Sequence, residues 1–135
     1  MRYMLLVYGN EDISEDQVAP EQLNASYAAV GAYYGAQAQR GFVPEVAERL
    51  RPTAMATTVR VNNGQVIVTD GPFAETKERL GGINIFECQD LDEAIALAAK
   101  FPTVANGHGS MEIRPIWEAS PEMLKHFEQP GGEGG

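Results

Sequence analysis

Residues 57–70 read TTVRVNNGQVIVTD and carry the clearest structural signal in the chain. The pair Asn63-Gly64 stands between two runs rich in β-branched residues, and both residues tolerate positive φ angles. This pattern predicts a β-hairpin with a two-residue type I′ turn, in which Thr57 lies opposite Asp70. Because side chains alternate along a strand, one face of the hairpin carries Thr57, Val59, Val61, Val66, Val68 and Asp70. A carboxylate therefore ends an apolar stripe.

The next stretch, residues 69–78, reads TDGPFAETKE, and its Gly-Pro pair ends the strand directly after Asp70. We expect a functional site here, and Asp70 has two interpretations. It is either a general base beside an apolar surface, or the first residue of an Asx turn whose carboxylate accepts the N–H of Phe73 or Ala74. The two interpretations do not exclude each other.

Length, charge and cysteine content limit the class of protein. A chain of 135 residues is long enough for one domain with its own core. Its net charge of −9 argues against binding to nucleic acid or to an anionic membrane. A single cysteine, Cys88, excludes an intrachain disulfide. The chain shows no signal peptide and no apolar run of the ~18 residues that span a membrane. These features predict a cytoplasmic protein.

The other elements follow from apolar periodicity and capping signals. We expect strands at 3–8, 82–88 and 111–117, helices at 20–40 and 91–101, and a loop at 42–53. Helical spacing predicts that the first helix buries Leu23, Tyr27, Val30 and Tyr34, and that the second buries Leu91, Ile95, Ala98 and Phe101. Gly31 and Gly35 predict that the backbone of the first helix packs closely against a neighbouring element.

The order of these elements, β-α-β-β-β-α-β, predicts an α+β fold. It is that of a ferredoxin-like antiparallel sheet with two helices on one face and an extra strand. Both faces of the first strand are apolar, and no predicted element covers the second face. We therefore expect a homodimer formed sheet to sheet. The domain is predicted to span 1–120, with a C-terminal extension at 121–135 that is disordered from Gln129 onward.

Five segments together resemble the YCII-related family, in its DGPF subgroup. They are TTVRV at 57–61, VTDGPFAETKE at 68–78, LGG at 80–82, DLDEA at 90–94 and EIRP at 112–115. The resemblance runs from the first strand to about Trp117 and implies a ferredoxin-like domain in a dimeric α+β barrel. Some family members are attached to extracytoplasmic-function sigma factors or encoded beside them. The resemblance thus also implies a sigma-factor partner as one alternative.

The resemblance implies cofactor-free acid–base chemistry for some members, in which a histidine of the first helix works with a strand aspartate in lyase-type or dehydrohalogenation reactions. Asp70 matches the motif aspartate, but the helix at 20–40 contains no histidine. His108, in an Asn-Gly-His-Gly loop before the last strand, is the candidate replacement. The alternative interpretation of His108 is an exposed loop residue.

Three further residues are candidates for ligand binding. Lys77 either clamps an anionic group or belongs to a solvated charged turn. Arg114 is an anion anchor, an edge-strand charge or part of a dimer salt bridge. Tyr8 either lines the pocket or belongs to the core, as do the tyrosines of the first helix. Two histidines and one cysteine do not supply the ligands of a metal site, and no cofactor motif is present.

Two main functions are consistent with these residues. The first is a small-molecule-binding protein or a cofactor-free lyase-type enzyme, whose pocket collects Asp70, Lys77 and Arg114. The alternative is a non-catalytic dimeric regulatory or interaction module of the kind associated with sigma factors. A cofactor-free monooxygenase is a third possibility, which rests on architecture alone.

Overall fold

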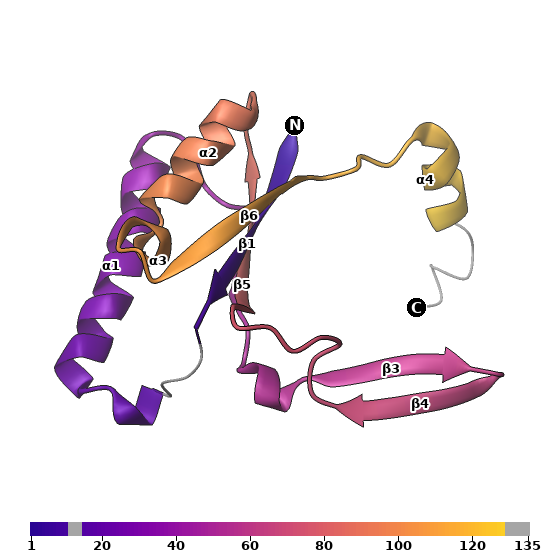
Figure 1. The fold of residues 1–135 in the computed structure, drawn as a ribbon. Coiled ribbons are helices and arrows are strands. Elements are labelled where there is room, and N and C mark those ends of the chain that lie inside the picture. The colour runs from indigo at the N-terminus through magenta and orange to yellow at the C-terminus, as the bar shows by residue number, and fades with distance from the viewer. Residues whose placement is uncertain (11–14, 129–135) are drawn as a thin grey trace.

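The computed structural model describes residues 1–10 and 15–128, and its ribbon is drawn in Figure 1. Its strands are β1 (Arg2–Gly9), β2 (Val46–Arg49), β3 (Thr57–Asn62), β4 (Gln65–Asp70), β5 (Arg79–Glu87) and β6 (Gly109–Pro115). Its helices are α1 (Pro20–Gln39), α2 (Leu91–Lys100), α3 (Pro102–Ala105) and α4 (Pro121–Phe127), with short 3₁₀ turns η1 (Glu15–Gln17) and η2 (Thr53–Met55). The tail predicted to be disordered lies outside the described residues.

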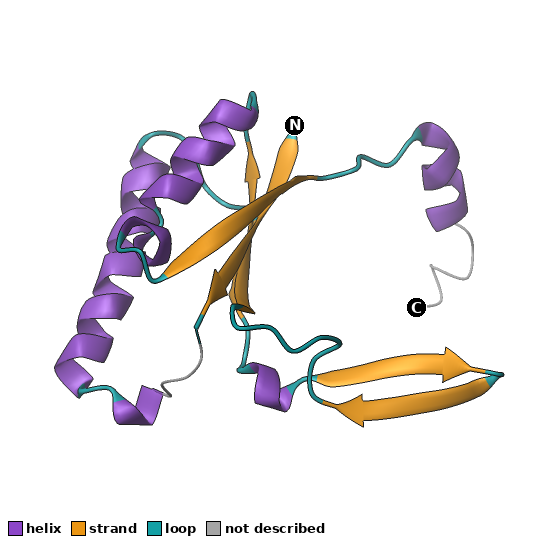
Figure 2. Ribbon diagram, in the orientation of Figure 1, coloured by secondary structure: helices purple, strands orange, loops and turns teal. Residues whose placement is uncertain are grey.

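The main sheet has the strand order β2-β5-β1-β6, and every neighbouring pair is antiparallel. This order is the ferredoxin-like arrangement, so the predicted α+β fold class is confirmed. The first strand lies in the centre of the sheet, as its apolar sequence on both faces predicts. Helices α1, α2 and α3 lie on one side of the sheet (Figure 2).

Two expectations about the sheet are wrong. The segment 42–53 is not only a loop, because β2 pairs with β5 at the sheet edge. The two hairpin strands, which were expected in the main sheet, form a separate two-stranded sheet. Since β2 is four residues long and half charged, its periodicity is too weak to detect. The hairpin itself is as predicted. Its turn has Asn63 at φ 50° and Gly64 at φ 77°, and its register extends to the pair Thr57–Asp70.

The core lies between the sheet and the helices. Leu5 and Phe86 have no exposed surface, and Leu97 of α2 packs against them with 1% exposed. Cys88 is buried in the same cluster, which agrees with a structural role. Its burial raises the pKa of the thiol and opposes formation of a thiolate. The core is thus formed by one face of the sheet only.

The buried faces of both helices agree only in part with those predicted. In α2, the predicted Ala98 and Phe101 at its end are buried, together with Ala94 and Leu97, while Leu91 and Ile95 are about half exposed. Two alanines on the inner side, Ala94 and Ala98, allow the helix to approach the sheet closely. The capping box that begins α2 is confirmed, because Asp90 accepts the N–H of Glu93 at 2.9 Å and the Glu93 side chain accepts the N–H of Gln89 at 2.6 Å.

In α1, Tyr33 and Gln37 are buried and the predicted Tyr34 packs against the core, whereas Tyr27 is 47% exposed. Tyr27 donates a hydrogen bond to Glu15, and its ring lies under the guanidinium of Arg49. This local partner holds the tyrosine at the surface, beside the sheet edge. A Cβ added at Gly31 or at Gly35 would meet only open space, so close backbone approach does not explain these glycines.

Candidate functional site

The face of the main sheet without helices, called the open face below, has an apolar centre and polar edges. Alternation from the buried Leu5 places Met4, Leu6 and Tyr8 on this face. The register forms two rows across the strands: Glu48, Ile83, Leu6 and Glu112, then Val46, Ile85, Met4 and Arg114. A third row contains Tyr8 and Ser110. The five central apolar side chains are half-buried and form a floor.

A group of hydrogen-bonded polar side chains lies at one end of this floor. The hydroxyl of Tyr8 donates to Oε1 of Glu112 at 3.4 Å. The guanidinium of Arg114 donates to the other oxygen, Oε2, at 3.5 Å. One carboxylate therefore links a phenol and a cation across two neighbouring strands. The Arg114 side chain is 69% exposed, so this ion pair contributes little to the stability of the isolated chain.

The DGPF-containing loop reaches the same end of the open face. Glu78, directly before β5, accepts a hydrogen bond from Ser110 of β6 at 3.0 Å. This bond crosses the end of β1, because β1 lies between the two strands. Lys77 directly precedes Glu78 in this loop. We call Tyr8, Glu78, Ser110, Glu112 and Arg114 the open-face polar cluster.

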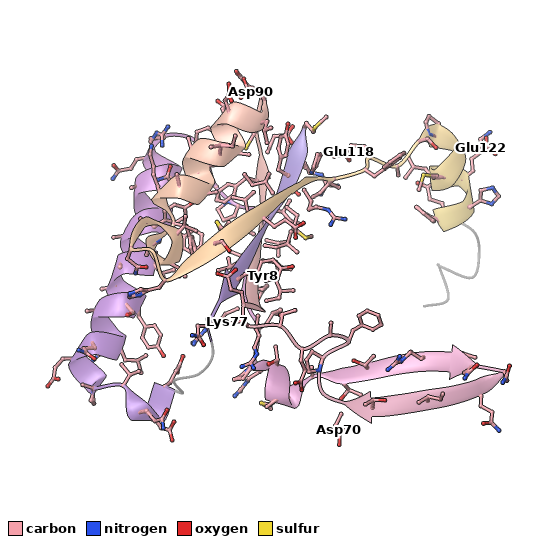
Figure 3. All side chains as sticks on the ribbon, in the orientation of Figure 1. Tyr8, Asp70, Lys77, Asp90, Glu118 and Glu122 are labelled. Atoms are coloured by element: carbon pink, nitrogen blue, oxygen red, sulfur yellow. The ribbon has the colours of Figure 1, made fainter. Side chains whose placement is uncertain are left out.

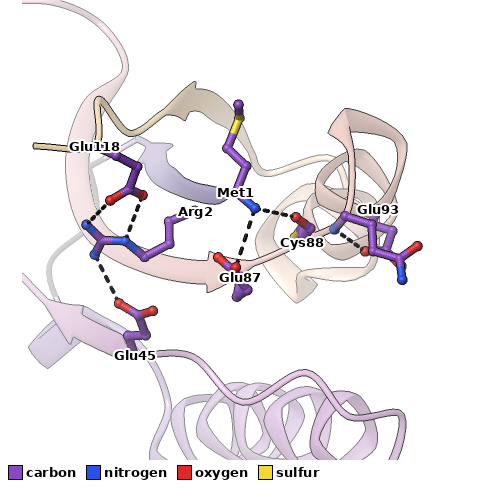
Figure 4. Close-up of polar contacts among 8 residues, drawn as sticks. Met1, Arg2, Glu45, Glu87, Cys88, Glu93 and Glu118 are labelled. Carbon is purple, nitrogen blue, oxygen red and sulfur yellow. Dashed lines mark hydrogen bonds and ion pairs between the residues drawn. The ribbon is translucent and has the colours of Figure 1, made fainter. Parts of the chain in front are cut away.

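A second set of charges closes the opposite end of the open face. Arg2 donates to Glu45, which precedes β2, and to both oxygens of Glu118, which follows β6 (Figure 4). Hydrogen bonds to Glu118 and to Glu45 raise the pKa of the guanidinium above its ordinary value. The amino group of Met1 adds an ion pair with Glu87. These contacts tie the two sheet edges to the central strand.

Asp70 lies apart from the open-face polar cluster, at the base of the hairpin (Figure 3). Its side chain is exposed, and among residues 1–10 and 15–128 its carboxylate accepts no hydrogen bond. The described residues therefore show no Asx turn with Phe73 or Ala74. The turn is closed instead by Thr58, whose hydroxyl donates to the carbonyl of Gly71 at 2.8 Å. Within one chain, the structure does not bring Asp70 together with Lys77 and Arg114.

A small groove of about 190 Å³ does follow the DGPF-containing loop. It is lined by Thr53, Gly71, Pro72, Glu75 and Arg79. Arg79 is held there by a hydrogen bond from its Nε to the carbonyl of Thr76 at 3.2 Å. The guanidinium and the Glu75 carboxylate make the groove polar, but Asp70 is not among the lining residues.

His108 lies on the helical side of the molecule. It lines a groove of about 350 Å³ between α1 and α3, together with Ser26, Val30, Thr103 and Asn106. Its backbone N–H donates to the Asn106 side chain and to the carbonyl of Thr103, both at 3.0 Å, which holds the loop in place. His108 therefore lies on the helix-covered side of the sheet and not on the open face.

Tyr33 and Tyr34 of α1 pack in the core. The Tyr33 hydroxyl donates to the carbonyl of Leu97 at 2.8 Å, and the Tyr34 hydroxyl donates to Oδ1 of Asn84 at 2.7 Å. Burial raises the pKa of both phenols. Asn84 is 1% exposed, and its Nδ2 has no hydrogen-bond partner among the described residues. These groups stay protonated and neutral, which suits a structural role.

Sequence reasoning missed Glu78, Ser110 and Glu112 as members of a site. The alternation of the last strand was a usable signal, because it places Glu112 and Arg114 on one face. Within the described ranges, no three histidine, cysteine or carboxylate side chains gather in a way that could hold a metal ion. No described helix is both long and apolar enough to span a membrane.

Comparison with known proteins identifies the relatives of this chain. A model of the YCII-related domain matches residues 1–120. Uncharacterized protein R00369 of Rhizobium meliloti (strain 1021) is 37% identical over 126 residues, which cover 92% of this chain and 98% of the relative. The structure of 5-chloro-2-hydroxyhydroquinone dehydrochlorinase (TftG) from Burkholderia phenoliruptrix AC1100, in complex with 2,5-dihydroxybenzoquinone, is similar with a TM-score of 0.46 and 16% identity, covering 90% of this chain and 98% of that one. The chain belongs to the YCII-related family.

Proposed function

We propose that this protein binds a small molecule on the open face, above the open-face polar cluster. The supporting observation is the linked set of Tyr8, Glu112 and Arg114 beside an apolar floor. Ligand sites commonly combine an apolar lining with a few convergent polar groups that fix orientation. A phenol, a carboxylate and a guanidinium within one hydrogen-bonded set provide a donor, an acceptor and a cation.

The chemistry of the cluster defines the class of ligand. An apolar body fits the floor at Leu6 and Ile83, and an acidic group such as a carboxylate or a phenolate fits the cations Arg114 and Lys77. The floor is open to solvent in one chain, so the proposed site requires a cover. We propose that a second subunit supplies it by dimerisation through the open face.

The catalytic form of this proposal is a cofactor-free acid–base reaction. A carboxylate accepts a proton from the ligand, and the electron pair that remains either expels a leaving group or forms an anion that Arg114 or Lys77 stabilises. Asp70 is the proposed base on the strength of the motif. Because it lies at the hairpin base, it contacts a ligand on the open face only if a second subunit brings it there.

A thermal-shift screen against phenols, small carboxylates and phosphorylated metabolites tests the binding proposal. The variants are Tyr8→Phe and Glu112→Gln, and the matched control is Glu48→Gln, which changes the other end of the same row. A ligand at a concentration of 100 times its Kd raises the free energy of unfolding by about 2.7 kcal/mol. We expect one compound to stabilise the wild type and the control but neither cluster variant. Equal stabilisation of all four proteins would contradict a site at the cluster.

A turnover assay on each compound that binds separates catalysis from binding. We expect Asp70→Asn to keep ligand binding and lose turnover of the ligand if Asp70 is the base, while His108→Ala keeps both. Loss of turnover in His108→Ala alone would move the acid–base role to the groove between α1 and α3. A dimer that binds no compound, but binds a sigma factor, would support the regulatory module instead.

A further inference from the structure

The hairpin exposes an apolar surface that has no partner among residues 1–10 and 15–128. Val59, Val61, Val66 and Val68 share one side and are 61%, 67%, 68% and 62% exposed. We call these four residues the valine face. Neither β3 nor β4 packs extensively against any other helix or strand of the described chain. A two-stranded hairpin of this kind is marginally stable in water without a surface to pack on.

The opposite side of the hairpin is different. Ile67 on that side is less exposed, at 40%. The guanidinium of Arg60 lies 5.8 Å from the centre of the Phe73 ring, so the DGPF-containing loop folds back toward this side. One side of the hairpin therefore has a local cover, and the valine face has none.

The exposed area of the whole chain also indicates a missing partner. The chain exposes 9789 Å², whereas a compact monomer of its mass exposes roughly 6,900 Å². Setting aside about 1,800 Å², the area of eleven residues of an unfolded chain, for the positions outside the described ranges still leaves an excess. The remaining area, about 1,000 Å², is the amount that one subunit buries in a stable dimer.

We infer that the valine face docks on the open face of a second copy of this chain. This inference deepens the homodimer proposed above, because it names the segment that crosses between the subunits. Figure 1 shows that the hairpin and α4 project from the sheet on the side away from α1, α2 and α3. They border the space in front of the open face, and that space is where the second copy lies.

The dimensions of the two surfaces agree. Each hairpin strand has six residues and is about 20 Å long. The four strands of the main sheet span about 14 Å between their outer axes. The hairpin is therefore long enough to cross a whole sheet. Its valines would meet the row of the apolar floor formed by Val46, Ile85 and Met4, which leaves Leu6 and Ile83 for the proposed ligand.

A second copy fits this surface better than an unrelated partner. Each chain carries one valine face and one open face, so a two-fold axis satisfies both surfaces of both chains at once. The C-terminal segment adds to the same interface, since Trp117 is 90% and Phe127 63% exposed. In the dimer, each open face is covered partly by the opposite sheet and partly by the opposite hairpin.

The first test compares two variants at neighbouring positions of β4. Val66→Glu places a carboxylate on the valine face, and Ile67→Glu places the same group on the other side of the hairpin. Light scattering and sedimentation give the dimer dissociation constant, and circular dichroism confirms folding. We expect Val66→Glu to weaken the dimer at least tenfold and Ile67→Glu to change it less than threefold. A monomeric wild type would overturn the homodimer and this inference together.

The second test locates the contact directly. A photoreactive benzoylphenylalanine at position 66 is cross-linked in dimers mixed from ¹⁴N- and ¹⁵N-labelled chains. We expect mixed-isotope products that join residue 66 to peptides of β1, β5 or β6. A dimer that cross-links only within one chain, or that tolerates Val66→Glu unchanged, overturns the inference. Ligand binding by that dimer would still support the proposed function, so the two failures are distinguishable.

Discussion

The main sheet and the hairpin are both antiparallel and rich in β-branched and apolar residues, but their burial is opposite. Leu5 and Phe86 of the sheet have no exposed surface, whereas every residue of β3 and β4 except Thr58 is exposed. The sheet is covered by helices on one side, and the valine face of the hairpin is covered by nothing among the described residues. An apolar stripe on a strand therefore indicates a surface that packs against a partner, and this partner need not belong to the same chain.

This contrast divides the molecule into a part that stabilises the chain and a part that we assign to association. The helix-covered face of the sheet contributes the hydrophobic core. The hairpin, the open face and α4 lie on the other side (Figure 1), and the hairpin valines and Phe127 of α4 are exposed. The predictions below test this division, beginning with the largest effect.

The sharpest comparison is between Phe86→Ala and Val68→Ala. Phe86 is fully buried, so its truncation is expected to lower the free energy of unfolding by about 3–5 kcal/mol. Val68 is 62% exposed, and its truncation is expected to cost below about 1 kcal/mol where the protein is a monomer. Urea denaturation at two protein concentrations measures both. Equal losses for the two variants would remove the distinction between sheet and hairpin.

The second comparison concerns pH and the buried phenol of Tyr33. Burial raises its pKa in the folded state, so above about pH 10 the unfolded chain releases this proton while the folded chain keeps it. The free energy of unfolding therefore falls as pH rises above 10. Tyr33→Phe should remove part of this slope and, through loss of the bond to Leu97, cost about 1 kcal/mol at neutral pH.

The control for the alkaline slope is a variant that lowers stability without removing an ionisable group. Leu97→Ala meets this need, because it is destabilising and changes no titration. Denaturation curves at pH 7 to 11 should show the wild-type slope in Leu97→Ala and a shallower slope in Tyr33→Phe. The same slope in both variants would exclude Tyr33 as its source.

The third comparison uses two helix caps of similar geometry. Asp90 accepts the N–H of Glu93 at 2.9 Å in α2, and Ser120 accepts the N–H of Met123 at 3.1 Å in α4. Asp90→Ala should lower the free energy of unfolding by about 1 kcal/mol. Ser120→Ala should change global stability by less than about 0.5 kcal/mol, since α4 has no buried residue and its fraying is local. A larger effect at Ser120 would show that α4 belongs to the core.

The smallest expected effect is a gain of stability. Gly31 lies in α1, where an added Cβ meets open space, so Gly31→Ala should stabilise the protein by about 0.5–1 kcal/mol. Gly64, at φ 77° in the hairpin turn, is the contrasting position, and Gly64→Ala should be destabilising there. Thermal unfolding of both variants measures the two signs. A loss of stability in Gly31→Ala would indicate a contact made by α1 in the assembled protein.

Much of the fold could be predicted because it depends on short-range chemistry. The Asn63-Gly64 turn set the register of the hairpin down to Thr57 and Asp70, and the capping box at Asp90 set the start of α2. The functional site was harder to predict. Tyr8 and Arg114 are linked through Glu112 on the open face, whereas Asp70 and His108 lie elsewhere, because spacing along a strand says nothing about which sheet that strand joins. The DGPF subgroup stays a prediction.

Local sequence was therefore sufficient for the hairpin, the helix limits and the membership of an α+β family, since turns, caps and alternation act over a few residues. Long-range pairing decided the rest. It selected β2 rather than the hairpin as the neighbour of β5, left one face of the sheet open, and joined Glu78 to Ser110 across β1. Such pairings depend on the free energy of burying whole surfaces against one another, and no single stretch of sequence contains both surfaces.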